Sequence, residues 1–461
     1  MNRFASTDTI AALATAPNRA GVAVVRLSGP QALAAAAAVC ARVAKAKPRT
    51  MIYGDFVNQN GEVIDHGLAV YFKAPNTFTG EDIVELHGHG GRAVVQALMD
   101  ALLAQKDVRA AEAGEFSRRA FLNGKMDLTA AEGLADLVDA ETEEQRRQAL
   151  RQLDGELGQV FEAWRSRLLH LVAHVEAAID FPDEELEVLE AAGLKDGLTN
   201  LVADMQTALN NQVGERVRDG FQVAVVGVPN AGKSTLTNML TGKETAIVSP
   251  IAGTTRDVVE AHMTIGGYPI ILADTAGLRQ TDDSIEAEGV IRARRRAEGA
   301  DLVLAVTPAP DYPSIDADVL ASLRPNHSLV IISKTDCFHI ELPKTVSHNG
   351  VDYPVVGLNL TETGSLGNLL PYMKSLIERA FGQTQGGARL TRDRHRSAIL
   401  KAVEHMERAL TLYQNPSCTY SLSDLLAQDL RDAAGAIGTV TGRTDTESVL
   451  DVVFSTFCVG K

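Results

Sequence analysis

The sequence has few cysteines and lacks a long apolar segment. Its 461 residues include four cysteines, and no two of them form a C-x-x-C pair. This usage favours a reducing compartment over a disulfide scaffold. There is no run of about 18 apolar residues that could span a membrane, and "MNRFASTDTIAALATAPNR" at the N-terminus lacks a signal-peptide pattern. We therefore expect a cytoplasmic protein without membrane-spanning segments.

The sequence also lacks an excess of positive charge, since its formal net charge is -15. Such a surface has no broad attraction for nucleic acid, so contact with RNA would require a local patch, a partner protein, or both. Two basic clusters are available, "IRARRR" at 291–296 and "TRDRHR" at 391–396. For each cluster, a solvated helix face is the favoured interpretation.

The chain is long enough for roughly three domains. Residues 1 to about 120 alternate short apolar runs with glycine-rich turns, which predicts a mixed α/β domain. From about 125, apolar residues recur at helical spacing and predict long amphipathic helices. From about 220 to 383, buried-strand runs alternate with helix-like stretches, as in a parallel sheet with helices on both faces.

We infer a multidomain protein of the α/β and α classes, in which an α/β domain is inserted into a helical domain built from both flanks. The packing of the two flanks is expected because each needs a partner for its apolar stripe. The predicted segments are 1–122, 123–218, 219–383 and 384–461.

The stretch "GVPNAGKS" at 227–234 matches the phosphate-loop pattern G-x-x-x-x-G-K-[ST]. It follows the apolar run "FQVAVVG" and precedes the helical run "STLTNML", the context that the motif requires. Backbone N–H groups of the loop and of the helix N-terminus can surround phosphates. Lys233 can bridge the outer phosphates and Ser234 can ligate magnesium.

Later motifs resemble the Ras-like GTPase pattern. "AGTTRD" contains Thr254 and Thr255, one of which should ligate magnesium only when the γ-phosphate is present, and we assign Thr255 to that role. In "DTAG", Asp274 can hold the magnesium shell through water and the N–H of Gly277 can reach the γ-phosphate. The carboxylate of "SKTD" at 333–336 can accept two guanine N–H groups, a donor pair that adenine lacks.

The guanine motif departs from its usual form, N-K-x-D, because Ser333 replaces the asparagine. Lys334 can still lie across the base and Asp336 can still accept from guanine. A later base-contacting motif, usually S-A-x, reads Leu-Thr-Glu at 360–362. We predict GTP as the nucleotide, with guanine affinity reduced by these departures.

The catalytic water needs an orienting group. Leu278 follows "DTAG" where Ras-type enzymes have glutamine, and leucine cannot orient water. Glu286 is a candidate for this role, although its spacing also fits a solvated helix carboxylate. The predicted nucleotide-binding residues are Asn230, Ala231, Gly232, Lys233, Ser234, Thr235, Ser249, Pro250, Ile251, Ala252, Gly253, Thr254, Thr255, Asp274, Thr275, Ala276, Gly277, Ser333, Lys334 and Asp336.

Several stretches together resemble the MnmE (also TrmE) family of tRNA-modification GTPases, and the resemblance covers nearly the whole chain. They are "DTIAALATAPNRAGVAVVRLSG", "APNTFTGEDIVELHGHGG", "AGEFSRRAFLNGKMDL", "EAAIDFPDEE", "IAGTTRDVV" and the terminal "FCVGK", besides the phosphate loop. The resemblance implies an α+β tetrahydrofolate-binding N-terminal domain, a discontinuous helical domain, an inserted Ras-like P-loop G domain, and a homodimer formed through the N-terminal domain.

The resemblance also implies a reaction. Members act with the flavoprotein MnmG (also GidA) in a heterotetramer-type complex. They install a carboxymethylaminomethyl or aminomethyl group on carbon 5 of the wobble uridine of certain tRNAs. A tetrahydrofolate derivative, in a 5-formyl or methylene form, supplies the one-carbon unit, while flavin and NADH belong to the partner. The sequence leaves open which tRNAs react and whether glycine or ammonium is the second donor.

The family's folate contacts map onto Arg26, Glu85, Lys125 and Lys461. A carboxylate suits the donor edge of a pterin, and cations suit its glutamyl tail. The C-terminal helix would then bring Cys458 beside the folate, where a thiolate favoured by a nearby cation could attack the uridine ring. A purely structural role for Cys458 stays open. The two histidines of "HGHGG" fit a turn lining the folate pocket, or else a metal pair.

The resemblance also implies a potassium site. Asn230 matches the asparagine that binds potassium in members, and Ser249, Ile251 and Thr254 stand where further contacts come from the switch loop. The ion would offset transition-state charge where other systems use an arginine finger. Two G domains would meet face to face, with Glu286 positioning the water. We expect potassium-stimulated hydrolysis without a separate activating protein.

Three alternatives are compatible with parts of the sequence. A ribosome-assembly or translation GTPase of the Era or Der type shares the phosphate loop but leaves the first 125 residues and "FCVGK" unexplained. A folate-dependent one-carbon transferase with a regulatory G domain differs in its acceptor. A nucleotide-gated scaffold without enzymatic activity is disfavoured by the intact Lys233, Ser234 and Asp274, and more weakly by Glu286.

Overall fold

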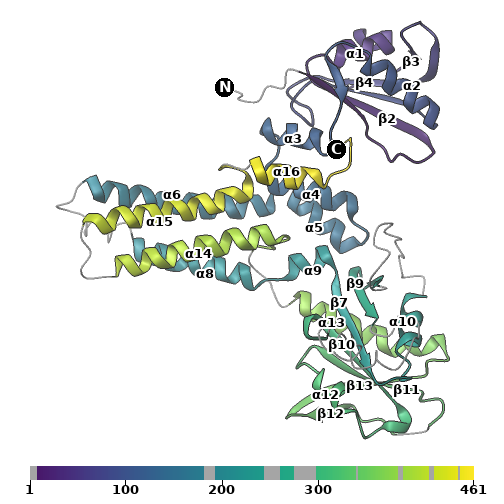
Figure 1. Ribbon diagram of the computed structural model, residues 1–461, viewed down its shortest axis with the longest axis vertical. Coiled ribbons are helices and arrows are strands. Elements are labelled where there is room, and N and C mark those ends of the chain that lie inside the picture. The colour runs from purple at the N-terminus through teal and green to yellow at the C-terminus, as the bar shows by residue number, and fades with distance from the viewer. Residues whose placement is uncertain are drawn as a thin grey trace, which may run out of the picture. The chain divides into compact units, whose positions relative to one another are not determined.

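The computed structural model describes residues 8–180, 193–242, 260–274, 297–338, 341–382, 388–414, 420–444 and 447–460 (Figure 1). The chain divides into two compact units, and both are discontinuous in sequence. Unit 1 comprises residues 1–135, 152–195 and 404–461, and unit 2 comprises residues 136–151 and 196–403. The four domain boundaries expected from the sequence stay predictions.

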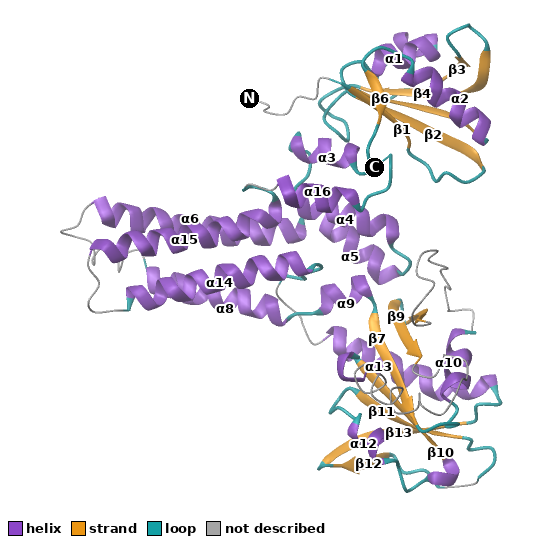
Figure 2. Cartoon of the chain, in the orientation of Figure 1, coloured by secondary structure: helices purple, strands orange, loops and turns teal. Residues whose placement is uncertain are grey.

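In unit 1, six strands of the described chain form a sheet in the order β3-β4-β5-β2-β1-β6 (Figure 2). Only β1 and β6 pair in parallel. Val25, Leu27, Val84 and Leu86 point into a core shared with two helices. Since side chains alternate along a strand, Arg26 and Glu85 lie on the opposite face. The elements are β1 (Thr9–Leu13), β2 (Ala20–Ser28), α1 (Ala32–Val39), β3 (Ile52–Val57), β4 (Val63–Phe72), β5 (Ile83–Gly90), α2 (Arg92–Leu103) and β6 (Val108–Ala110).

Helices complete unit 1. The helices α6 and α15, which come from opposite flanks of the central α/β segment, pack along each other, as expected for the two flanks (Figure 1). Arg431 of α15 forms an ion pair with Glu176 of α6 (2.8 Å). A second core joins Leu128 of α4 to Phe454 of α16. The helices are α3 (Glu115–Leu122), α4 (Leu128–Asp139), α6 (Glu156–Asp180), α15 (Tyr420–Thr441) and α16 (Glu447–Ser455).

In unit 2, seven strands of the described chain form a sheet in the order β12-β13-β11-β10-β7-β9-β8. The five inner strands are parallel, and the edge strands β12 and β8 are antiparallel to their neighbours. The strands are β7 (Phe221–Gly227), β8 (Glu260–Ile265), β9 (Tyr268–Asp274), β10 (Leu302–Pro308), β11 (Ser328–Ser333), β12 (Thr345–His348) and β13 (Val351–Leu358).

Helices cover both faces of this sheet. Leu302 and Leu304 of β10 pack in one core with residues of α10 and α13, whereas Val303 and Ala305 pack with Val319 of α12 on the other face. These helices are α10 (Lys233–Thr241), α12 (Ala317–Ala321) and α13 (Leu366–Gly382). The predicted fold class, a multidomain protein with a parallel-rich sheet inserted between helical segments, is confirmed.

The remaining helices are α5 (Glu143–Leu153), α8 (Leu194–Asn210), α9 (Val213–Asp219) and α14 (Asp393–Tyr413). The cluster "TRDRHR" contributes internal ion pairs in unit 2. Arg392 binds Asp136 (2.7 Å) and Arg396 binds Glu215 (3.1 Å). Among the described residues, none of the helices is both long enough and apolar enough to cross a membrane.

Candidate functional site

The turn between β7 and α10 carries the predicted phosphate loop. Gly232 has φ +95° and Asn230 has φ +60°, so both adopt the left-handed conformation that costs glycine least. Lys233 Nζ donates to the carbonyl oxygens of Gly227 (2.9 Å) and Val228 (2.8 Å), which holds the ammonium group over the loop. Ser234 lies in the first turn of α10, where the helix dipole favours anions.

Ser333 ties the guanine motif to this loop. Its side chain is fully buried, and its hydroxyl donates to the carbonyl oxygen of Ala231 (2.6 Å). Its hydroxyl therefore supports the loop, a role that the sequence did not reveal. Asp336, three residues later, is exposed, while Lys334 is half-buried and has φ +59°.

The packing of Leu360 explains why the segment at 360–362 reads Leu-Thr-Glu. Leu360 is buried, and a Cβ added to Gly232 would lie 2.5 Å from its Cδ1. An apolar side chain therefore packs directly against the phosphate loop. Thr361 donates its backbone N–H and its hydroxyl to Asn359 Oδ1 (2.9 and 2.7 Å), which fixes the turn before α13.

Asp274 ends β9, next to β7 in the sheet. Because parallel strands end at a common edge, this position lies at the edge that carries the phosphate loop. The other predicted switch, water-positioning and tail residues, Ser249, Pro250, Ile251, Ala252, Gly253, Thr254, Thr255, Thr275, Ala276, Gly277, Glu286 and Lys461, lie outside the described residues, as does the cluster at 291–296.

Arg26 and Glu85 form the second group of predicted residues that the structure brings together. They are register partners on β2 and β5, and the guanidinium group lies 2.8 Å from Glu85 Oε1. His87 Nε2 lies 3.3 Å from the other carboxylate oxygen. The hydrogen bond with His87, and then the charge of Arg26, hold the pKa of Glu85 below its usual value against the opposing effect of burial. The guanidinium carbon also lies 5.8 Å from the ring centre of Phe116.

Lys125 reaches the same region through the loop at residues 75–81. Its Nζ donates to the carbonyl oxygen of Pro75 (3.0 Å), while Phe78 of that loop lies beneath Arg26 (5.9 Å). The loop is anchored by Arg119, a buried residue to which the sequence assigned no role. Arg119 binds Glu81 (3.2 Å). The signal available in the sequence was the stretch "AGEFSRRAFLNGKMDL".

The C-terminal tail docks on the N-terminal part of unit 1. Val459 forms an isolated β-bridge with Ala113, and the N–H of Gly114 donates to the carbonyl oxygen of Cys458 (3.4 Å). Gly114 has φ +67°, and a Cβ there would collide with the carbonyl oxygen of Phe454. The sequence "FCVGK" therefore belongs to an ordered contact up to residue 460.

The end of this tail lies against the end of β1, the strand next to β2 in the sheet. Gly460 is packed against the carbonyl oxygen of Leu13, with no room for a Cβ. Leu13 is adjacent to Ala12, which pairs with Arg26 in the sheet. The side chain of Cys458 is exposed.

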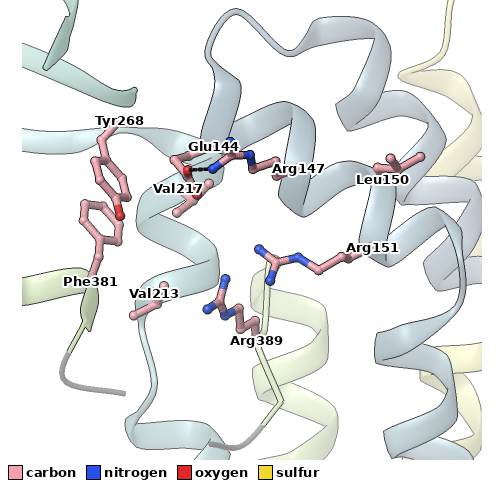
Figure 3. Close-up of a pocket in the computed structure, with 9 residues that line it drawn as sticks. All are labelled: Glu144, Arg147, Leu150, Arg151, Val213, Val217, Tyr268, Phe381 and Arg389. Carbon is pink, nitrogen blue, oxygen red and sulfur yellow. Dashed lines mark hydrogen bonds and ion pairs between the residues drawn. The ribbon is translucent and has the colours of Figure 1, made fainter. Parts of the chain in front are cut away.

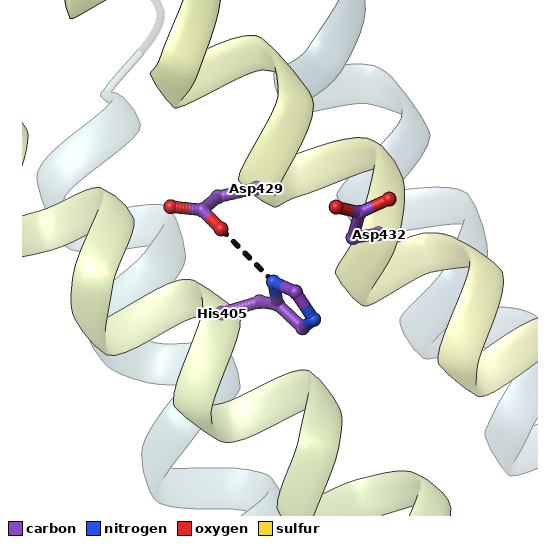
Figure 4. Close-up of side chains that lie close together, drawn as sticks. All are labelled: His405, Asp429 and Asp432. Atoms are coloured by element: carbon purple, nitrogen blue, oxygen red, sulfur yellow. Dashed lines mark hydrogen bonds and ion pairs between the residues drawn. The ribbon is translucent and has the colours of Figure 1, made fainter.

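The histidines of "HGHGG" do not converge on one point. His87 contacts Glu85, whereas His89 Nδ1 lies 2.8 Å from Asp65 Oδ1. The described residues contain one group with metal-ligand spacing, formed by His405, Asp429 and Asp432 (Figure 4). A guanidinium nitrogen of Arg408 already lies 2.7 Å from Asp429 Oδ1, so a cation occupies the carboxylate without a metal.

Comparisons with known proteins point to one family over nearly the whole chain. The family model "GTP-binding protein TrmE N-terminus" matches residues 9–125, and the model "MnmE helical domain" matches residues 128–458. The protein named tRNA modification GTPase MnmE from Rhodospirillum rubrum is 47% identical over 98% of this chain and 99% of its own length. Its counterpart in Paramagnetospirillum magneticum is 46% identical over 98% of this chain and its full length.

Among solved structures, the G domain of the T. maritima FeoB iron transporter is 24% identical, with a TM-score of 0.23, and covers 35% of this chain and 98% of that one. A TM-score this low supports no conclusion about this chain.

Proposed function

Because the chain belongs to the MnmE (TrmE) family and is a GTP hydrolase that acts in tRNA modification, we propose that its GTPase reaction is potassium-dependent and coupled to folate chemistry at the wobble uridine. In this proposal the chain forms a homodimer and acts with MnmG. A tetrahydrofolate derivative provides the one-carbon unit. The observation that carries the proposal is the coexistence, in one chain, of the phosphate loop and of a sheet that bears the Arg26–Glu85 pair and whose strand β1 contacts the docked tail.

At the phosphate loop, the chain's own groups suit a magnesium-bound triphosphate. The N–H groups at the start of α10 and the ammonium group of Lys233 would bind phosphate oxygens, and Ser234 would bind magnesium. Thr255 would join the magnesium shell, while Asn230, Ser249, Ile251 and Thr254 would bind potassium. Glu286 would position the water that attacks the γ-phosphate.

At the folate site, the Glu85 carboxylate would accept hydrogen bonds from the pterin edge. Its pKa is already held below the usual value by His87 and Arg26, so it stays ionised at neutral pH and remains an acceptor. Lys125 and Lys461 would face the anionic part of the cofactor. The exposed Cys458 thiol lies on the tail that ends beside this region.

Folate binding tests the first half of the proposal. Isothermal titration of the full chain with 5-formyltetrahydrofolate should show one site per protomer, and Glu85→Ala should weaken binding at least about tenfold, the cost of a charge-assisted hydrogen bond. Glu62→Ala, at an exposed glutamate in the turn between β3 and β4, should bind like the wild type. If the wild type and Glu85→Ala bind 5-formyltetrahydrofolate with equal affinity, Glu85 does not contact the folate.

Cation dependence tests the second half. GTP hydrolysis measured as phosphate release should be faster in potassium chloride than in sodium chloride at equal ionic strength. Asn230→Ala should bring the two rates together, because it removes a proposed potassium ligand while leaving Lys233 in place. Equal rates for the wild type in both salts would contradict the potassium site and leave the folate half untouched.

A further inference from the structure

A pocket of about 470 Å³ lies in unit 2 (Figure 3). No residue of the phosphate loop, 227–234, is among those that line it. Its polar lining comes from Glu144, Arg147 and Arg151 of α5 and from Arg389, just before α14. Tyr268 of β9 and Phe381 of α13 form part of its apolar wall. The volume is in the range typical of sites for small molecules, about 300–1,000 Å³.

Two of the pocket's three arginines have no protein partner in the described part of the chain. Arg147 is engaged, since it binds Glu144 (2.9 Å) and Glu143 (2.8 Å). The guanidinium groups of Arg151 and Arg389 make no hydrogen bond or ion pair with any described residue, although both side chains line the pocket. The lining therefore carries an excess of positive charge on a chain whose net charge is -15.

The other wall of the pocket includes two aromatic rings. The ring of Tyr268 stacks on that of Phe381, with ring centres 4.4 Å apart and planes 13° apart. Phe381 in turn packs on Phe221 of β7 (5.7 Å). This chain of contacts fixes the aromatic wall to the central sheet. The guanidinium groups of Arg151 and Arg389 have no protein partner among the described residues, and they line a pocket with an aromatic wall. This combination suits a ligand that contains both an anion and a planar ring.

We propose that this pocket binds a nucleotide unit, with its phosphate between Arg151 and Arg389 and its base against the apolar wall. The unit is either a free nucleotide or one residue of an RNA strand, and both offer the same phosphate and base. This site goes beyond the proposed function, because it needs neither the folate pair nor potassium.

The pocket is distinct from the phosphate loop. Tyr268 begins β9, whereas Asp274 ends it at the edge of the sheet that carries the loop. At about 3.3 Å per residue, the two ends of this strand are about 20 Å apart. A nucleotide unit in the pocket would join α5 to the sheet, because its phosphate contacts Arg151 and its base contacts the wall that includes Tyr268.

The pocket is also a local patch of positive charge through which an acidic chain could contact RNA. The cluster "TRDRHR" contributes Arg392 and Arg396 to ion pairs with Asp136 and Glu215. Those guanidinium groups are already engaged. Arg151 and Arg389 are therefore better placed to contribute positive charge to a phosphate.

The test uses the full chain loaded with one equivalent of GDP, so that the phosphate loop is filled and no excess GDP competes for the pocket. One probe is adenosine 5′-monophosphate, followed by isothermal titration, and the other is a fluorescent eight-nucleotide oligouridylate, followed by anisotropy. The variant Arg151→Glu/Arg389→Glu reverses both uncommitted charges. The control, Lys374→Glu/Arg379→Glu, makes the same charge change at exposed positions of α13 outside the pocket.

We expect the pocket variant to weaken binding at least about tenfold, as for loss of a charge-assisted contact, and the control to stay within about twofold. If the pocket variant binds both probes more weakly, the site accepts free nucleotides. If it binds only the oligouridylate more weakly, the site is an RNA contact. Equal binding by the pocket variant and the control overturns the inference. GTP hydrolysis and thermal unfolding of each variant, measured separately, show whether it remains folded and whether the proposed function stands.

Discussion

Two glycines at opposite ends of α3 allow the docking of the C-terminal tail to be measured. Gly114 and Gly124 both have φ +67°, so replacing either by alanine incurs the same left-handed backbone cost, about 1–2 kcal/mol. The surroundings differ. A Cβ at Gly114 would collide with the carbonyl oxygen of Phe454 and lie 3.0 Å from Phe457 Cβ, whereas one at Gly124 would meet nothing within 4 Å.

Gly114→Ala should therefore destabilise unit 1 more than Gly124→Ala does. The excess is the cost of forcing an extra carbon into a packed contact, about 1–3 kcal/mol. The entropy that alanine removes from the unfolded chain is similar at both positions, so it cancels in the difference. Gly124→Ala thus serves as the matched control.

Urea unfolding followed by tryptophan fluorescence is the assay. The only tryptophan, Trp164, lies buried in α6 of unit 1 and reports on that unit. Equal losses of unfolding free energy in the two variants would refute the close packing of Gly114 against α16. The tail, and Cys458 with it, would then lack the docking described above.

Three further predictions concern the two sites. Ser333→Ala should lower the unfolding free energy of unit 2 by about 1–3 kcal/mol, the cost of losing a buried hydrogen bond, and should raise the Kd for GDP. The control Ser322→Ala removes a solvent-exposed hydrogen bond and should change neither quantity. Calorimetry measures the unfolding free energy, and titration measures the Kd. The pKa of Glu85 is lowered in the folded state, so its ion pair stabilises the fold at pH values above the ordinary glutamate pKa of about 4.5. This contribution is lost as the pH falls through the folded-state pKa. Glu85→Gln should therefore be less stable than the wild type at pH 7, and the difference in unfolding free energy should shrink towards pH 3. Cys458→Ser should leave GTP hydrolysis unchanged but abolish wobble-uridine modification if the thiol is the nucleophile; full modification, read by mass spectrometry of tRNA digests, would assign Cys458 a structural role.

The sequence was sufficient where the signal is local. The phosphate loop, the alternation of strands and helices around it, and the amphipathic helices of the two flanks follow from motifs and periodicities within short windows. The pairing of Arg26 with Glu85 places two predicted residues in contact. It depends on the register of β2 against β5, which no local pattern specifies.

The roles of Ser333 and Leu360 could not be predicted in the same way. Ser333 binds a carbonyl oxygen 102 positions away in the sequence, and Leu360 packs on Gly232 from a different segment. Motif matching identifies both positions only as departures from guanine motifs, because it compares residue types and ignores what surrounds them. The structure shows that both side chains support the phosphate loop, which is a packing constraint between distant segments.

The most direct test of the account is mass spectrometry of wobble uridines from cells that lack this chain, complemented either by the wild type or by Lys233→Ala. We predict that the carbon-5 modification disappears in the deletion strain, returns with the wild type, and does not return with Lys233→Ala, because the proposed function couples folate chemistry to GTP hydrolysis at the phosphate loop. Full modification in the deletion strain, or with the Lys233→Ala variant, would contradict it.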